Sequence, residues 1–223
     1  MVVPNKVFLS WSGGKDSSLA LYEIQKAKNH HVAALLTTIT EDYDRISMHG
    51  VRVALLEQQA ESLGLALKKI LIPKDSTNEI YEARMRALLE AGLGEGIDTV
   101  AFGDIFLEDL KIYREKNLAQ LGMKGLFPIW KRDTAELAQT FIGLGFKAVL
   151  ACIDTAFLDP SFAGRSYNED LLRDLPPNVD PCGENGEFHS FAFDGPIFEH
   201  KINLTVGQVV RRDRYCFCDL IPA

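Results

Sequence analysis

The sequence is poor in positive charge. Its 223 residues include 24 Lys and Arg against 31 Asp and Glu, which gives a formal net charge of −7. Broad nucleic-acid surfaces depend on clustered Lys and Arg, and here the basic residues are dispersed among acidic ones. The composition therefore argues against nucleic acid as a partner, although it leaves room for a local basic groove.

Cysteines and long apolar runs are also few. The four cysteines show no paired spacing, and the sequence has neither a positively charged apolar leader nor an apolar run near the length of a membrane span. Disulfide frameworks and membrane helices need such features, so we expect a cytoplasmic protein with no membrane partner. With 47% hydrophobic and 25% charged residues, the chain can form one large or two small cores.

Strands and helices are predicted to alternate over the first half of the chain. Short apolar runs typical of buried strands alternate with segments of helical spacing. The expected strands are 6–11, 32–38, 67–72 and 99–103, and the expected helices are 17–29, 51–63, 78–91 and 107–121. This order predicts an α/β fold, with a Rossmann-like parallel sheet that carries helices on both faces.

The pattern changes after Gly122. We expect a helix over 133–144, a strand over 147–153, a loop-rich stretch over 154–195 and short β-like segments over 197–221. The change predicts two domains, residues 1–125 and a smaller α+β domain of residues 126–223. The sequence leaves the oligomeric state open, a homo-oligomer included.

A glycine pair separates the first expected strand from the first helix, in Ser12-Gly13-Gly14-Lys15-Asp16-Ser17. Glycines there let the backbone approach a ligand, and the helix points its N–H groups at it, which suits phosphate. Neither common phosphate loop fits. The Walker A pattern requires Gly where Leu9 stands, and the dinucleotide fingerprint requires a third glycine. The alternative is a tight turn capped by polar side chains.

This segment resembles the S-G-G-x-D-S loop of the PP-loop ATP pyrophosphatases, which split ATP between the α and β phosphates. The resemblance implies that ATP is held by backbone and side-chain groups of Ser10, Ser12, Gly13, Gly14, Lys15, Asp16 and Ser17. It further implies catalytic roles for Lys15, which would offset developing charge, and for Asp16, which would orient magnesium.

The resemblance extends to the diphthine–ammonia ligase (diphthamide synthase) family and its bacterial relatives. It is carried by Met48-His49, Phe102-Gly103-Asp104-Ile105, Pro128-Ile129-Trp130 and Glu184-Asn185-Gly186-Glu187-Phe188-His189-Ser190. Members join an ATP-binding domain of the HUP type to a smaller C-terminal domain. They adenylate a carboxylate, release pyrophosphate and form an amide with ammonia. We therefore expect an AMP-forming carboxylate–ammonia ligase that uses ATP and Mg²⁺ on a small-molecule or protein-borne carboxylate.

Three residues in the first half are further candidates. Gly103 and Asp104 follow the fourth expected strand, where open α/β sheets collect ligands, so we expect them to contact the nucleotide and Asp104 to bind magnesium. A cap for the next helix is the alternative. His49 is a candidate for contact with the phosphates or the acyl adenylate, or else a surface histidine.

The acidic segment 184–190 is the candidate ammonia site. Glu184 and Glu187 are expected to hold ammonium and to accept its proton, and Asn185, Gly186 and His189 to contact the substrate. Members that amidate diphthine usually read Glu-Gly-Gly-Glu, whereas this chain has Asn185 in place of the first glycine. A solvated acidic loop is the alternative interpretation.

Two other functions stay open at this stage. One is RNA thiolation, which also uses S-G-G-x-D-S loops and for which Cys152 or Cys182 would have to carry sulfur. The other is a regulator that binds an adenine nucleotide without turnover. Cys216 and Cys218 alternate as in a strand, so we expect both thiols on one face, with core packing favoured over a metal pair.

Overall fold

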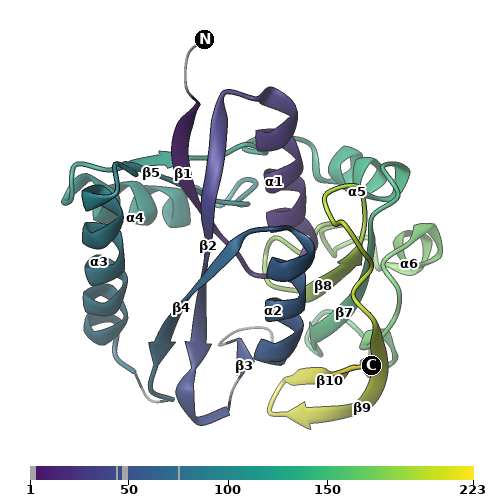
Figure 1. Ribbon diagram of the computed structural model, residues 1–223. Coiled ribbons are helices and arrows are strands. Elements are labelled where there is room, and N and C mark those ends of the chain that lie inside the picture. The colour runs from purple at the N-terminus through teal and green to yellow at the C-terminus, as the bar shows by residue number, and fades with distance from the viewer. Residues whose placement is uncertain (1–3, 44, 47–49, 75) are drawn as a thin grey trace.

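Two β-sheets separated by a layer of helices organise the chain in the computed structural model (Figure 1). The structure describes residues 4–43, 45–46, 50–74 and 76–223, so the predicted site residue His49 lies outside the described residues. Within these ranges, none of the helices combines the length and apolar character that a membrane span requires.

The larger sheet is built from parallel strands. Its hydrogen-bonded order is β4 (Ala66–Ile72), β2 (His30–Thr40), β1 (Asn5–Ser10), β5 (Thr99–Ala101) and β6 (Lys124–Leu126), and β3 (Arg45–Ile46) pairs antiparallel with the end of β2. Each parallel crossover contains a helix, as such connections require. The chain first winds from β1 outward to β4 and then returns past β1 to β5 and β6. The predicted parallel sheet is confirmed.

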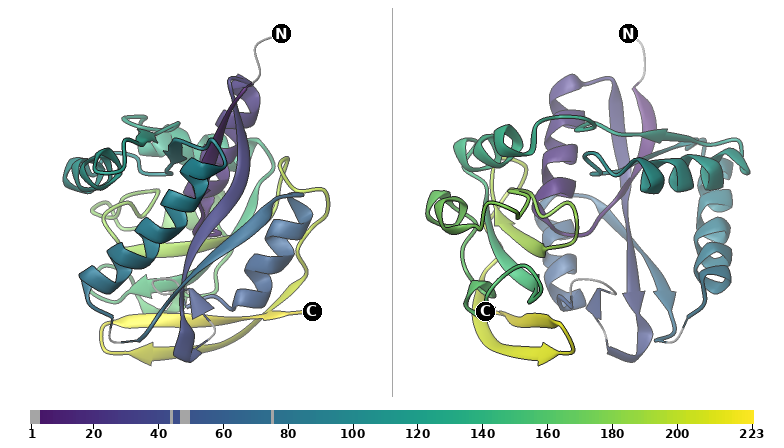
Figure 2. Two further views of the ribbon diagram at one scale, coloured as in Figure 1. Left: turned by 60° about the vertical axis from the view of Figure 1, so that its left-hand side comes forward. Right: turned by 180° about the vertical axis from the view of Figure 1, so that it is seen from behind.

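Helices cover both faces of this sheet. One face carries α1 (Lys15–Ala27) and α2 (Val53–Ser62), and the other carries α3 (Asn78–Gly94) and α4 (Glu108–Ala119) (Figure 2). In β1, Val7 and Leu9 pack toward the first pair of helices and Phe8 toward the second pair. A central strand buried on both faces reads as an unbroken apolar run, which is how it appears in the sequence.

The smaller sheet is antiparallel. Its order is β8 (Phe188–Asp194), β7 (Lys147–Asp154), β10 (Tyr215–Pro222) and β9 (Leu204–Arg212). It is accompanied by α5 (Thr134–Gly143), by α6 (Glu169–Asp174) and by a 3₁₀ turn at Pro160–Phe162. A smaller second α+β unit is therefore present. Cys216 and Cys218 on β10 are both buried in the core, as expected from their alternation.

Part of the stretch predicted to be loop is β8. The turn residues around Gly183 and Gly186 favoured a loop in the sequence, but residues 188–194 pair with β7 in antiparallel register. Phe188 and Phe191 are buried there. The strand is stabilised by contacts with residues far away in the chain, which local sequence patterns do not report.

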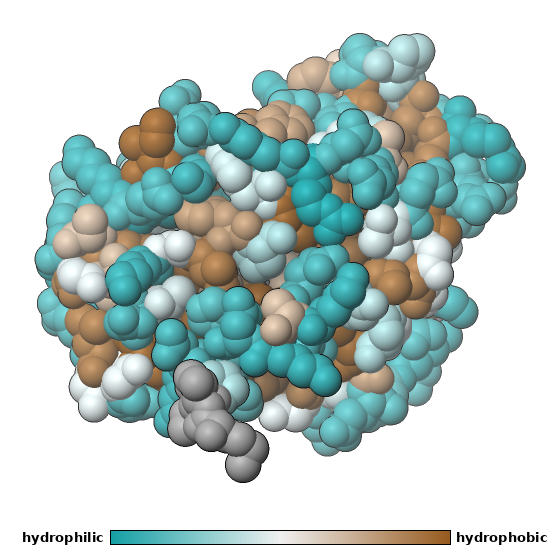
Figure 3. Space-filling model, turned by 90° about the horizontal axis from the view of Figure 1, so that it is seen from above, coloured by the Kyte–Doolittle hydropathy of each residue, from teal (hydrophilic) through white to brown (hydrophobic). Residues whose placement is uncertain are grey.

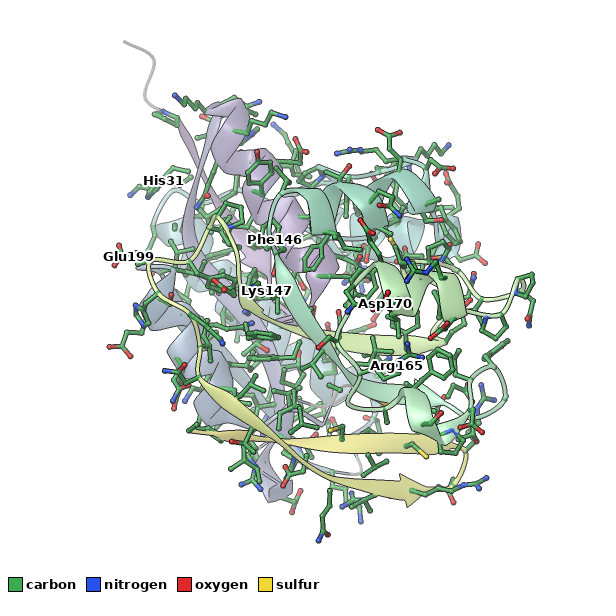
Figure 4. The ribbon with its side chains drawn as sticks, turned by 90° about the vertical axis from the view of Figure 1, so that its right-hand side faces the viewer. His31, Phe146, Lys147, Arg165, Asp170 and Glu199 are labelled. Carbon is green, nitrogen blue, oxygen red and sulfur yellow. The ribbon has the colours of Figure 1, made fainter. Side chains whose placement is uncertain are left out.

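One continuous core joins the two units. Phe146 precedes β7 and lies between the smaller sheet and α1 (Figure 4). Its ring stacks on Phe141 of α5 at 4.8 Å between centroids and meets Tyr22 of α1 edge-on at 6.2 Å. At the end where β1 begins, by contrast, polar and apolar residues are interspersed over the surface (Figure 3). The apolar side chains of α1 and α2 pack instead against the smaller sheet, within the common core.

Candidate functional site

The candidate site lies at the carboxyl ends of β1 and β5. These strands are parallel neighbours at the centre of the sheet, and the chain leaves them toward opposite sides. Such a switch in direction opens a crevice in which α/β sheets bind ligands. The predicted loop Ser12–Ser17 follows β1, and the predicted pair Gly103-Asp104 follows β5. The topology therefore brings these two predicted groups together.

The loop after β1 is held in shape by its own polar groups. Gly13 has a positive φ of 74°, and the Gly14 amide donates to Ser12 Oγ at 3.2 Å. Ser17 Oγ donates to the Gly14 carbonyl at 3.0 Å. The N-cap residue of α1 is Gly14, which has no side chain to cap the helix, and the positive end of the helix dipole is directed at the loop. This arrangement suits a bound anion.

Two glycines allow close backbone contacts around the loop. A Cβ atom on Gly14 would lie 2.9 Å from the Ser190 carbonyl oxygen, and one on Gly103 would lie 2.9 Å from the Asp16 carbonyl. Both distances are too short for any other residue type. Gly103 therefore has a packing role against the start of α1, and the predicted nucleotide contacts of both glycines stay predictions.

Strand β8 docks directly onto the loop. The Lys15 amide donates to Ser190 Oγ at 3.1 Å, and the Ala192 amide donates to the Gly13 carbonyl at 2.8 Å. The motif that ends at Ser190 therefore belongs to the same site as the loop, although Lys15 and Ser190 lie 175 residues apart in the chain. In the sequence these appeared as two separate halves of a reaction.

Gln59 on α2 joins the loop, the helix and β8. This fully buried side chain donates from Nε2 to the carbonyls of Gly13 and Ala192, at 3.0 and 2.6 Å, and its Oε1 accepts from Trp11 Nε1 at 2.9 Å. Sequence reasoning missed this residue. One signal was available, because Gln59 occupies the helix face shared with Leu55 and Leu56, where a buried polar residue needs partners.

Lys15 is buried and oriented toward the C-terminal part of the chain. Its ammonium lies 2.7 Å from Asp16 Oδ1, donates to the Cys182 carbonyl, and sits over the rings of Phe188 and Tyr167 at 5.6 and 5.8 Å. Burial alone would lower the pKa of Lys15, but nearby negative charge, led by Asp16, raises it above the usual value. Lys15 is therefore positively charged within the site.

Glu184 reaches across to the end of β5. Its Oε1 accepts from the amides of Ile105 and Phe106, at 2.7 and 3.3 Å. Burial raises the pKa of Glu184 to about 7, against the opposing effect of these two hydrogen bonds. A carboxyl group with this pKa exchanges protons near neutral pH, which is what a general base needs.

Glu187 has different surroundings. It is 1% exposed, and its carboxylate accepts from the Asp180 amide and from the amide and side chain of Asn185, each at 3.0 Å. These contacts close the turn that contains Gly186, which has a φ of 89°. The carboxylate of Glu187 thus organises the loop, and its predicted contact with ammonium stays a prediction, as do the predicted substrate contacts of Asn185 and Gly186.

His189 follows on β8 and is largely enclosed. Burial, assisted by the positive charge of Lys15, lowers the pKa of His189 to about 4. The imidazole is therefore neutral at pH 7. A neutral ring can hydrogen-bond a substrate but supplies no positive charge for a carboxylate.

Asp104 is paired with Arg114 on α4. The guanidinium Nε and Nη2 lie 2.6 and 3.0 Å from the two carboxylate oxygens, and the group stacks over the Phe102 ring at 4.4 Å. The sequence suggested no role for Arg114. A pocket lies between α3 and α4. Phe102 and Arg114 border it, and Ser10 and Leu36 line one of its ends. This pocket adjoins the loop at the central crevice.

The site offers few side chains that could bind magnesium. No cluster of three or more His, Cys, Asp or Glu side chains suited to a metal occurs in the described ranges. Asp16 is paired with Lys15, and Asp104 with Arg114. Mg²⁺ commonly takes one or two carboxylates together with substrate phosphates, so the metal roles of Asp16 and Asp104 stay predictions.

Comparison with known proteins agrees with this architecture. The family model described as the diphthamide synthase N-terminal domain matches residues 5–125, and that of the C-terminal domain matches residues 133–220. The chain belongs to the diphthamide synthase family. The relationship suggested by the loop and by segment 184–190 is thereby confirmed over most of the chain.

Individual relatives are distant but align with most of this chain. The chain is 27% identical to a diphthine–ammonia ligase of Schizosaccharomyces pombe, over 94% of this chain and 38% of the relative. It is 26% identical to the enzyme of that name from Danio rerio and 25% identical to that from Homo sapiens. These alignments cover 89% of this chain in both cases, and 86% and 82% of the relatives. The family member thus spans well under half of the S. pombe protein.

One solved structure shows partial similarity. A U34-tRNA thiolase from Methanococcus maripaludis, with its [4Fe-4S] cluster, aligns with 63% of this chain and 58% of its own. The TM-score is 0.38 and the sequence identity is 18%. Similarity at this level has no bearing on function.

Proposed function

We propose that this family member is an ATP-dependent ligase that adenylates a carboxylate, releases pyrophosphate and forms an amide with ammonia. The observation that carries the proposal is the convergence of three segments on one crevice: the Ser12–Ser17 loop, the residues after β5, and the segment that contains Glu184. Diphthine is the substrate named for the relatives, and a carboxylate of that kind is the proposed substrate here.

The loop is the proposed phosphate site. Its backbone and hydroxyl groups surround the start of α1, where an anion is favoured. Lys15 provides positive charge to stabilise pyrophosphate as it leaves, and Asp16 orients this ammonium through their ion pair. Asp16 and Asp104 are the carboxylates that would hold Mg²⁺ against the phosphates.

Glu184 is the proposed acceptor of the ammonia proton. Its carboxyl group lies between the carboxyl end of β5 and the loop that carries Lys15. Its pKa of about 7 lets it take up a proton from ammonia during the attack. Ammonia then displaces AMP from the acyl adenylate, so that the C–N bond forms as the C–O bond to AMP breaks.

RNA thiolation has less support. Cys152 and Cys182 are both buried, and burial raises the pKa of each thiol to about 12. A reactive sulfur carrier needs a thiolate, which these surroundings disfavour. A cytoplasmic location and a homo-oligomeric state remain predictions from the sequence.

The products of ATP turnover test the proposal. The protein is incubated with ATP, Mg²⁺, ammonium and a broad set of carboxylic acids, and nucleotides are separated by chromatography. We expect AMP and pyrophosphate together, with a rate about 10²–10³-fold lower in Lys15→Met. Lys26→Met, at the other end of α1, is the matched control and should keep the normal rate. ADP as the product would contradict the proposal.

A further inference from the structure

Carboxylates surround the crevice in which the proposed ATP loop lies. Asp16 is in the first turn of α1, Asp104 follows β5, and Glu184 accepts from the two amides after Asp104. Like charges at close range repel one another, and the phosphates of ATP are strongly negative. A crevice that admits them therefore needs its own carboxylates to be neutralised.

Asp16 and Glu184 carry little net negative charge into the crevice. Asp16 is ion-paired with Lys15, at 2.7 Å between Oδ1 and Nζ. Burial raises the pKa of Glu184 to about 7, so this group is partly protonated at neutral pH. Asp104 depends instead on Arg114 of α4 for its counter-charge.

The pair of Asp104 and Arg114 is a close, two-point contact. Arg114 Nη2 donates to Oδ1 at 3.0 Å, and Nε lies 2.6 Å from Oδ2. The Asp104 side chain is 11% exposed and the Arg114 side chain 23%, so water and salt screen the two charges only in part. Contacts from a guanidinium group to both oxygens of a carboxylate are among the strong polar interactions of proteins. Arg114 therefore cancels most of the charge of Asp104.

A row of aromatic rings fixes the position of the Arg114 guanidinium. The group lies over the Phe102 ring, at 4.4 Å from its centroid. Phe102 stacks on Phe127 at 5.5 Å between centroids, and Phe127 in turn contacts Trp130 at 5.8 Å. Phe102 is buried in the core between the larger sheet and the helices α3 and α4. A guanidinium group stacks well on an aromatic face, so Arg114 is held in place before any ligand binds.

The backbone beside Asp104 is anchored to both sides of the crevice. Gly103 packs on the first turn of α1, where an added Cβ would lie 2.9 Å from the Ser17 amide nitrogen. On the other side, the Ile105 amide donates to Glu184 Oε1 at 2.7 Å. Asp104 is thus placed between a residue that contacts the proposed ATP loop and one that contacts the proposed base. Without its partner, the Asp104 carboxylate would present a negative charge next to the phosphate site.

We propose that Arg114 is a positioning residue that holds Asp104 and cancels its charge, so that the phosphates of ATP can enter the crevice. This inference rests on the proposed ATP loop. Arg114 acts through Asp104 and takes no part in bond breaking, so its effect belongs to ATP binding and precedes any chemistry. Mg²⁺ would add positive charge at the same carboxylate, and the role of Arg114 is therefore tested without it.

Calorimetric titration of ATP into the whole protein, in the presence of EDTA, tests the inference. Arg114→Met leaves the charge of Asp104 uncompensated, so the ATP affinity should fall about tenfold at low ionic strength and by less at high ionic strength. The double variant Asp104→Asn, Arg114→Met removes the remaining charge and should bind ATP within about threefold of wild type. Its affinity would stay low if Arg114 only filled space.

Lys116→Met is the matched control. Lys116 is exposed on the same helix, two residues after Arg114, and its replacement removes the same charge. The ATP affinity should stay within about twofold of wild type. Equal weakening in Lys116→Met and Arg114→Met, or a double variant that binds as weakly as Arg114→Met, would overturn the inference.

Asp104→Asn alone decides the case in which Arg114→Met does not fold. It leaves the guanidinium group beside the phosphate site without its carboxylate, so ATP in EDTA should bind about threefold more tightly than in wild type, or better. Equal or weaker binding would contradict the role given to Arg114.

The same titrations separate this inference from the proposed function. Failure of the wild type to bind ATP without Mg²⁺ would overturn the inference, and failure with Mg²⁺ as well would overturn the proposed ATP loop. Wild-type binding that Arg114→Met leaves unchanged would count against the role of Arg114 alone. Normal ATP binding with no AMP formed from any acid would count against the ligase alone.

Discussion

Glu184 and Glu187 stand three residues apart in the chain but have different environments. Glu184 is held at one oxygen by two amides after β5, and burial raises its pKa to about 7. Glu187 accepts three hydrogen bonds from its own loop. At the scale of single residues, we therefore propose the acid–base role for Glu184 and a structural role for Glu187.

Replacement of Glu184 by Gln should separate activity from stability. The rate of amide formation should fall about 10²–10⁴-fold and lose its rise near pH 7, because the base is gone. Because the pKa of Glu184 is raised in the folded protein, ionisation of this carboxyl group opposes folding. The free energy of unfolding is therefore highest below the unfolded pKa near 4.5 and declines as pH rises through about 7. Glu184→Gln should therefore have a higher Tm than wild type at pH 8, and scanning calorimetry measures this.

Glu187→Gln is the control for that experiment. The amide would place an NH₂ group against N–H donors that now meet a carboxylate, so the free energy of unfolding should fall by about 1–3 kcal/mol. ATP affinity should survive in the folded fraction. If Glu187→Gln were instead as stable as wild type and formed no amide, Glu187 would be the base and the assignment here would be wrong.

Helix α2 lies between the two sheets and contacts both of them. It contacts the larger sheet with Leu55 and Leu56, and Gln59 on the same helix hydrogen-bonds both the loop after β1 and β8. The loop is therefore shaped by an element that carries no recognisable motif. The same helix ends beside the chain after β8, where Ser62 Oγ donates to the His200 carbonyl.

Gln59→Leu should weaken both the fold and the loop. The change leaves two buried carbonyls and the Trp11 indole N–H without this partner, so urea unfolding should show a loss of about 2–5 kcal/mol. ATP affinity at a temperature where the variant is folded should fall as well. Gln58→Leu, one residue earlier and partly exposed, is the matched control. Unchanged stability in Gln59→Leu would exclude the bridging role.

At the scale of the whole molecule, the two sheets share one core. Phe146 of the smaller unit packs on Tyr22 of α1, Phe141 stacks on Phe146, and β8 is hydrogen-bonded to the loop after β1. The division into domains of residues 1–125 and 126–223 stays a prediction. Side chains of both units belong to one hydrophobic core, so the core does not separate them. Two hydrogen bonds between the Ser12–Ser17 loop and β8 help to hold the loop in shape.

This shared core should make the protein sensitive to acid through His189. Its pKa of about 4 lies below the usual 6.5, so the stability it contributes is present above pH 6.5 and is lost as pH falls toward 4. At full protonation the loss is about 3 kcal/mol. His189→Gln should flatten the fall in Tm between pH 6.5 and 4. His31→Gln, an exposed position on β2 (Figure 4), should not.

The sequence by itself determined the strand and helix order of the first half, the position of the loop between β1 and α1, and the family. These features depend on local patterns: a buried central strand, helical spacing, and a glycine pair at the start of α1. The expected helix 78–91 and strand 67–72 agree with α3 and β4 to within three residues at each end. Glu184 was identified as a candidate because its motif is local too.

Only the tertiary structure decided which groups meet. The pairing of Asp104 with Arg114, the bridge made by Gln59 and the strand β8 depend on partners that local pattern does not specify. The two glutamates of one motif differ because one finds amides 79 residues away and the other finds amides in its own loop. Carboxylate chemistry depends on burial and on neighbouring donors, and both are set by the packing of distant segments.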